Sequence, residues 1–154
     1  MPSFSLKNLK GEVISLESLK GKILVLDFWA TWCGPCIIRF PGMLATMEKY
    51  KNNPDVVFLF VNTLESTTPN RLQRIKTLLN KNKYNFNVLL DEQLRGGKFY
   101  KLATELNVIG IPTKFIINKE GNIIFRESGG SINKDLFAEE LSMMIDLVRE
   151  KEGL

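Results

Sequence analysis

The sequence has no histidine and only two cysteines among its 154 residues. Structural zinc sites are tetrahedral and take four ligands, mostly from cysteine and histidine. Two cysteines cannot complete such a site, so we expect no metal centre. The two thiols remain available for a disulfide or for redox chemistry.

The sequence also lacks a large charge excess, a linker and a low-complexity tract. The 21 basic and 17 acidic residues leave a net charge of only +4. Because the basic side chains are dispersed along the chain, nucleic-acid binding is not expected. A chain of this length with 44% hydrophobic residues can bury a full core, which predicts one domain over residues 1–154.

The N-terminus has neither the charged nor the apolar region of an export signal, and no stretch is long and apolar enough to span a membrane. Two interpretations follow. Either the protein is cytosolic, or an export segment is missing from this sequence.

Both cysteines belong to the segment DFWATWCGPC, residues 27–36, which follows the aliphatic run ILVL of a buried-type strand. A helical pattern begins here, so Cys33 lies at a helix N-terminus, where free N–H groups and the helix dipole favour a thiolate. Cys33 is the expected nucleophile, and Cys36, one turn later, is the expected resolving thiol. Gly34 lets the backbone relax around the disulfide ring, and Pro35 pre-sets a helical φ.

Two other interpretations of the cysteine pair stay open. A purely structural disulfide is one, although so short a loop contributes only about 2 kcal/mol in the chain-entropy model. Two buried, inert thiols are the other. The exposed-type Trp32 beside the pair and the start of a helix favour redox chemistry over both.

Hydrophobic patterns predict an α/β order of elements with a β-hairpin near the C-terminus. Strands are expected at 23–28, 56–61, 88–90, 114–118 and 122–126, and helices at 35–51, 70–82, 96–105 and 134–149. Pro41 should kink the first helix, and Asn133 should cap the last. The basic residues of 70–82 alternate with aliphatic ones, as on the solvated face of an amphipathic helix.

The string WCGPC after LDFWA, with IPT at residues 111–113, resembles the thioredoxin superfamily. Further motifs are similar to its extracytoplasmic TlpA/ResA-like branch, and an AhpC/TSA-type assignment would be compatible with them. The resemblance covers nearly the whole chain. It implies a thioredoxin-like fold, with a central mixed β-sheet flanked by helices, an N-terminal β-hairpin and an inserted helix-strand unit at about 66–90. It implies no cofactor beyond the redox-active disulfide.

The resemblance also assigns roles to two acids. Asp27 matches the acid that lies behind the resolving cysteine and exchanges its proton. Packing and stability give little reason for a charged side chain inside an apolar strand, which favours this functional role. Glu65, in the string VNTLES, matches a glutamate beneath the active site; a solvated loop carboxylate is the alternative. Two desolvated carboxylates near one dithiol would repel, so one should hold a proton near neutrality. We hypothesise that this pair relays the proton of Cys36.

Residues 111–112 resemble the cis-proline loop of the superfamily. A cis Ile111–Pro112 bond would leave the N–H and C=O of Ile111 free to pair with an extended substrate segment. An ordinary trans-proline before a strand is the alternative. Trp32, with Gly34 and Pro35, would provide contact surface beside the nucleophile.

As a function, the resemblance implies a protein disulfide reductase. The Gly-Pro pair between the cysteines implies a potential toward the reducing end of the superfamily. The expected substrates are disulfide-bearing proteins of the cell envelope, as in cytochrome c maturation, with a membrane thiol carrier as electron donor. The expected protein is a monomer, periplasmic or membrane-anchored, and the sequence would be a shortened form of a longer chain.

Three alternative functions can be told apart from a disulfide reductase of the cell envelope. A cytosolic thioredoxin-like reductase would take its electrons from a flavoenzyme. A non-catalytic binding module would reduce no test disulfide. A peroxiredoxin-type peroxidase is disfavoured, because its P-x-x-x-T-x-x-C motif would need proline at Leu26 and threonine at Ala30.

Overall fold

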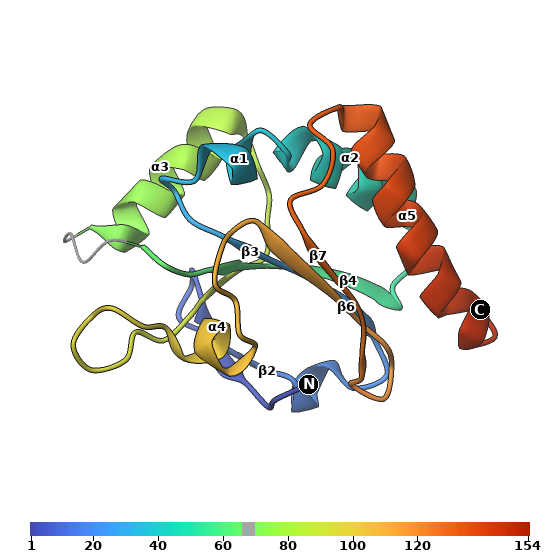
Figure 1. Ribbon diagram of the computed structural model, residues 1–154, viewed down its shortest axis with the longest axis horizontal. Coiled ribbons are helices and arrows are strands. Elements are labelled where there is room, and N and C mark those ends of the chain that lie inside the picture. The colour runs from blue at the N-terminus through green and yellow to red at the C-terminus, as the bar shows by residue number, and fades with distance from the viewer. Residues whose placement is uncertain (66–69) are drawn as a thin grey trace.

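A seven-stranded mixed sheet runs through the centre of the computed structural model, which describes residues 1–65 and 70–154 (Figure 1). The strand order is β2-β1-β5-β4-β3-β6-β7. The strands are β1 (Ser5–Asn8), β2 (Val13–Ser15), β3 (Ile23–Trp29), β4 (Val56–Asn62), β5 (Val88–Leu90), β6 (Thr113–Ile117) and β7 (Ile123–Ser128). The structure thus has the central mixed β-sheet that the resemblance implies.

Strand β3 lies inside the sheet, between β4 and β6, and is buried along its whole length. It pairs in parallel with β4 and antiparallel with β6, so both of its edges are hydrogen-bonded. Its run of aliphatic and aromatic residues is typical of a strand covered on both faces. Asp27 is the one acid in this strand, and it lies opposite Phe60 of β4 and Lys114 of β6.

Helices cover both faces of the sheet (Figure 1). Helices α1 (Gly34–Ile37), α2 (Phe40–Lys49), α3 (Arg71–Asn82) and α5 (Lys134–Lys151) lie on one face, and α4 (Lys101–Glu105) lies on the other with the 3-10 helix η1 (Glu17–Leu19). The core is correspondingly divided into two apolar clusters. One contains both cysteines with Phe40 and Phe137, and the other contains Phe28 with Leu102.

Several expected elements are confirmed. The N-terminal hairpin is β1 with β2, which pair antiparallel, and the inserted helix-strand unit is α3 with β5. Ser66, at the beginning of that insertion, lies outside the described residues. The side chain of Asn133 caps α5 by accepting a hydrogen bond from the backbone N–H of Leu136 at 2.9 Å.

Two expected helices differ from the structure. The helix expected at 35–51 is divided into α1 and α2, because Pro41 lacks the N–H that a continuous helix would use at this point. The helix expected at 96–105 begins only at Lys101. Gly96 and Gly97 have φ values of 90° and 73°, a left-handed backbone that cannot belong to an α-helix.

Candidate active site

The dithiol lies where β3 passes into α1. Cys33 is the N-cap of α1, with an extended backbone, and its sulfur accepts a hydrogen bond from the backbone N–H of Cys36 at 3.1 Å. The two residues form a disulfide. The predicted pairing and the predicted position of Cys33 at a helix start are both found. Gly34 and Pro35 form the first turn between them.

The disulfide lies just beneath the surface. Cys33 and Cys36 are each only 1% exposed, whereas their neighbours Trp32, Gly34 and Pro35 are exposed. The indole N–H of Trp32 donates to the backbone oxygen of Leu64 at 2.8 Å, which fixes the ring beside the cysteines. Because both cysteines are almost completely buried, a sulfur atom of another protein can reach them only if residues around them move aside.

A cis peptide bond joins Ile111 to Pro112, directly before β6. Thr113 pairs with Phe28 near the C-terminal end of β3. The cis bond therefore lies at the same end of this strand as the dithiol segment. Ile111 packs against the apolar cluster that contains both cysteines. Among the described residues, no hydrogen bond involves its backbone N–H or C=O. Nearby Ile109 is 90% exposed.

Asp27 is buried in the sheet beneath the dithiol. Its strand neighbours Val25 and Trp29 belong to the same apolar cluster as the cysteines. Burial is the main cause that raises the pKa of Asp27 from 3.8 to about 7. The positive charges of Lys114 and Arg39 act to lower this pKa, and the negative charge of Glu127 acts to raise it. Arg39 follows Cys36 by three residues in the chain. An acid with this pKa can accept or donate a proton near neutral pH.

Glu65 lies in the chain that follows β4 and is tied to the dithiol segment. Its side chain is fully buried and accepts hydrogen bonds from the backbone N–H of Thr31, from the Thr31 hydroxyl at 2.8 Å and from the Asn62 amide at 3.0 Å. Arg74 of α3 forms an ion pair with it at 2.7 Å. The alternative of a solvated loop carboxylate is therefore wrong.

The proton relay between Asp27 and Glu65 stays a hypothesis, and the geometry lends it little support. The charged groups that act on Asp27 are Lys114, Glu127 and Arg39, whereas Glu65 is committed to Thr31 and Arg74. The contacts of Glu65 instead clamp the dithiol segment to the inserted helix α3.

A second polar network continues this clamp, and the sequence patterns did not predict it. Arg71 of α3 donates to the side chain and backbone oxygens of Asn62 and to the backbone oxygen of Asp91. The Asp91 carboxylate accepts from the Thr63 hydroxyl and from two backbone N–H groups at the start of α4. Arg71 and Arg74 therefore do not lie on the solvated face expected for residues 70–82. Their spacing of three residues places both arginines on one side of the helix, and this is the sequence feature that could have indicated a common role for them.

We expect the replacement Glu65→Ala to lower the free energy of unfolding by about 2–4 kcal/mol, because it removes the buried acceptor shared by Thr31, Asn62 and Arg74. Glu65→Gln keeps one acceptor oxygen and should lose about half as much. Urea unfolding of the oxidised proteins measures both. The control is Glu48→Ala, which removes an exposed ion pair with Lys51 and should cost less than about 1 kcal/mol. Equal stability of Glu65→Ala and the parent would contradict the clamp.

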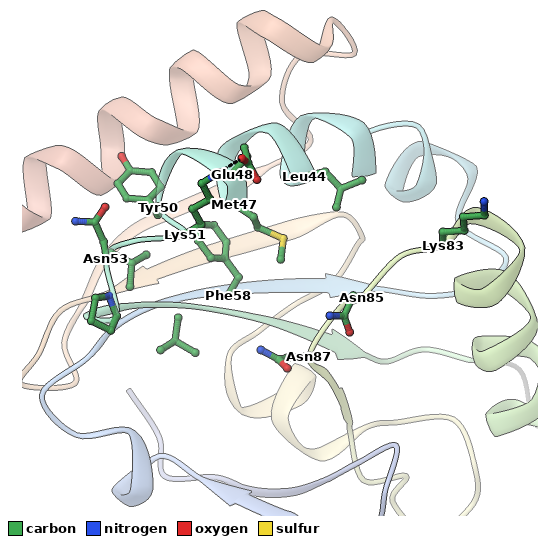
Figure 2. Close-up of a pocket in the computed structure, with 13 residues that line it drawn as sticks. Leu44, Met47, Glu48, Tyr50, Lys51, Asn53, Phe58, Lys83, Asn85 and Asn87 are labelled. Carbon is green, nitrogen blue, oxygen red and sulfur yellow. Dashed lines mark hydrogen bonds and ion pairs between the residues drawn. The ribbon is translucent and has the colours of Figure 1, made fainter.

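One hollow of the described structure lies beside the dithiol segment, and another lies away from it. A groove of about 550 Å³ is lined by Thr31 and Ile37 and by the polar face of α3. A separate hollow of about 500 Å³ lies between α2, the start of β4 and the segment before β5 (Figure 2). Its lining includes Met47 and Val56, and Val56 begins β4 at the end opposite to Asn62. None of the predicted site residues lines this second hollow.

The described residues contain no group of three or more histidine, cysteine, aspartate or glutamate side chains placed to hold a metal ion. Within that same part of the chain, no helix has both the length and the apolar character needed to cross a membrane.

Comparison with known proteins identifies relatives of this chain. Residues 1–126 match the AhpC/TSA family. The thioredoxin-like protein YneN of Bacillus subtilis is 31% identical over 122 residues, which are 79% of this chain and 65% of YneN. The thiol-disulfide oxidoreductase ResA of Bacillus thuringiensis is 32% identical over 140 residues, 91% of this chain and 73% of ResA. The chain thus spans about two thirds to three quarters of the length of these relatives.

Solved structures agree with this grouping. The crystal structure of StoA from Bacillus subtilis has a TM-score of 0.72 and 27% identity, covering 94% of this chain and 96% of StoA. A putative thiol:disulfide interchange protein DsbE from Chlorobium tepidum has a TM-score of 0.74 and 28% identity, covering 96% and 93%. Together with the Cys33–Cys36 disulfide at the start of α1, these matches show that the chain belongs to the AhpC/TSA family and is a ResA-like thiol-disulfide oxidoreductase of the thioredoxin superfamily.

Proposed function

We propose that this protein reduces disulfide bonds in partner proteins with the dithiol of Cys33 and Cys36. The observation that carries the proposal is the placement of both sulfurs in one helical turn, with Cys33 as the N-cap and a buried acid, Asp27, in the strand below. Backbone N–H groups and the helix dipole stabilise a thiolate on Cys33, which makes it the attacking sulfur.

The reaction runs in two exchanges. The Cys33 thiolate attacks one sulfur of the partner's disulfide; a Cys33–partner bond forms and the partner's other sulfur leaves as a thiolate. Cys36 then gives its proton to the Asp27 carboxylate and attacks the Cys33 sulfur. The mixed disulfide breaks, the Cys33–Cys36 disulfide forms, and two electrons have passed from this protein to the partner. Asp27 then releases the proton to solvent.

Partner recognition is expected to rely on backbone contacts and exposed apolar surface. The free N–H and C=O of Ile111 are suited to pair with an extended segment of the partner, as in strand addition. The exposed side chains of Trp32, next to Cys33, and of Ile109, two residues before Ile111, offer apolar surface for such a segment. A docked segment would also displace residues around the sulfur atoms.

The cell envelope is the proposed location. Support comes from the similarity to ResA, StoA and a putative DsbE. There the protein would act as a monomer on disulfide-bearing proteins, including apocytochromes, and a membrane thiol carrier would restore its electrons. Turnover with a cytosolic flavoenzyme reductase, in place of a membrane donor, would contradict this location.

The test of the proposed function is a single-turnover reaction of the reduced protein with a peptide that contains one disulfide. Mass spectrometry after rapid alkylation should find one peptide disulfide reduced for each Cys33–Cys36 disulfide formed. Protein alkylated before mixing is the control and should reduce none. Failure of the reduced, unmodified protein to reduce the peptide would overturn the proposal and favour a binding module.

A further inference from the structure

Three charged side chains from neighbouring strands form one row beneath the dithiol. Asp27 of β3 pairs in register with Lys114 of β6, and Lys114 pairs in register with Glu127 of β7. Side chains directly opposite each other on adjacent antiparallel strands point to the same face, with Cβ atoms about 5 Å apart. Acid, base and acid therefore follow one another across the sheet.

The row faces the helices that carry the cysteines. Val25 and Trp29, two residues on either side of Asp27, and Ile116, two residues after Lys114, all belong to the cluster that contains Cys36. Since residues two apart in a strand share a face, Asp27 and Lys114 lie under the same helical layer as the dithiol.

Lys114 is held in place by several contacts. It is only 2% exposed, and its ammonium group donates to the backbone oxygen of Gly129 at 3.0 Å. The same nitrogen lies 3.4 Å from a carboxylate oxygen of Glu127 and 4.8 Å from the ring centre of Phe137. A buried ammonium group costs several kcal/mol unless anions and hydrogen bonds compensate it. These contacts hold the ammonium group in the row between the two acids.

We propose that Lys114 and Glu127 are positioning residues for the reduction reaction, and that they set in opposite directions how readily Asp27 takes the proton of Cys36. This proposal rests on the proposed function and deepens it. Lys114 acts on Asp27 through charge and touches neither sulfur in the described contacts.

The charged neighbours in the row act on the protonation of the Asp27 carboxyl group. No hydrogen bond reaches the Asp27 carboxylate from the part of the chain that the structure describes, so burial and charge govern its proton. Burial raises the pKa of Asp27 to about 7, Lys114 and Arg39 act in the opposite direction by favouring the ionised carboxylate, and Glu127 opposes ionisation. Arg39 is anchored to the backbone oxygen of Gly130 at 2.7 Å and comes from the turn between α1 and α2. The uncharged Phe60 lies opposite Asp27 on β4.

The test compares the pH dependence of mixed-disulfide resolution in Lys114→Met, Glu127→Gln and the parent protein, measured by rapid acid quench in single turnovers from pH 5 to 9. Lys114→Met removes the favourable charge, so the midpoint of the profile should move to higher pH by about one unit or more. Glu127→Gln removes the opposing charge, so the midpoint should move to lower pH. Lys114→Arg keeps the charge and should restore most of the parental profile.

A second measurement does not depend on activity. In the oxidised protein the cysteines do not titrate, so infrared spectra can follow the C=O stretch of the protonated Asp27 carboxyl group, identified by its loss in Asp27→Asn. Its midpoint should rise in Lys114→Met and fall in Glu127→Gln. Glu127 is partly exposed, so Glu127→Gln is expected to fold even if Lys114→Met does not.

The outcomes separate the two proposals. Parental activity with superimposable pH profiles and unchanged carboxyl titration in the variants would overturn the role of Lys114 and Glu127 while leaving the reductase intact. Equal shifts in the same direction in both variants would indicate a merely structural effect and would also overturn it. Absence of disulfide reduction by the parent protein would overturn the proposed function, whatever the infrared titration shows.

Discussion

Replacing Asp27 by asparagine is expected to slow resolution of the mixed disulfide by about 100-fold or more at pH 7 to 8, while attack by Cys33 on the substrate stays within a few-fold of the parental rate. Asparagine has nearly the same shape as aspartate but cannot accept the proton of Cys36. The first exchange uses the thiolate of Cys33 at the start of α1 and does not need this proton acceptor.

Rapid quench separates these two exchanges, because mixed disulfide and oxidised protein differ in mass. Cys36→Ser defines complete loss of resolution, since it stops at the mixed disulfide. Asp55→Asn is the matched control: Asp55 is an aspartate that pairs with Arg149 at 3.4 Å, at the opposite end of the sheet from the dithiol. Resolution at the parental rate in Asp27→Asn would remove Asp27 from the mechanism.

The second large effect is on stability. The pKa of Asp27 is about 7 in the folded protein against an ordinary value of 3.8, so the folded state binds a proton more tightly than the unfolded state. Its contribution to stability is therefore complete below pH 3.8 and is lost as the pH rises through 7. At 1.36 kcal/mol per pKa unit, the difference between 3.8 and about 7 corresponds to about 4 kcal/mol.

We therefore expect the difference in unfolding free energy between Asp27→Asn and the parent to change with pH. As the pH rises from 3.5 to 8, it should shift by about 4 kcal/mol in favour of Asp27→Asn. Urea unfolding of both oxidised proteins at the two pH values measures this change. All other ionisable groups are common to both proteins, so their effects cancel in the difference. A difference that does not vary with pH would show that Asp27 has an ordinary pKa in the folded state and would weaken its role as a proton acceptor near neutrality.

The two expected effects of Asp27→Asn reflect a compromise between catalysis and stability. A buried carboxyl group that ionises near neutral pH destabilises the fold under the conditions in which the protein works. A leucine or valine at this position in β3 would pack without that cost. The acid is understandable in chemical terms, because Cys36 is buried as well and has few other routes for its proton.

The sequence alone determined the parts of this protein whose causes are local. The aliphatic run of β3, the Gly-Pro turn and the two cysteines lie within one short segment, so the strand, the helix start and the disulfide could all be predicted. The cis bond before Pro112 was expected from the resemblance to the cis-proline loop of the superfamily, and the structure contains it. The end of the first helix was anticipated only as a kink, since Pro41 marks a break without specifying its geometry.

Only the tertiary structure decided which charged groups meet. Glu65 binds Thr31 and Arg74, and Lys114 lies between Asp27 and Glu127, because strand pairing and helix packing bring together residues far apart in the chain. In the sequence, the two arginines of α3 look like solvated charges of an amphipathic helix, and nothing marks Lys114 as a neighbour of Asp27 and Glu127. Their burial and their partners depend on strand register, which shifts every side chain to the other face if it slips by one residue.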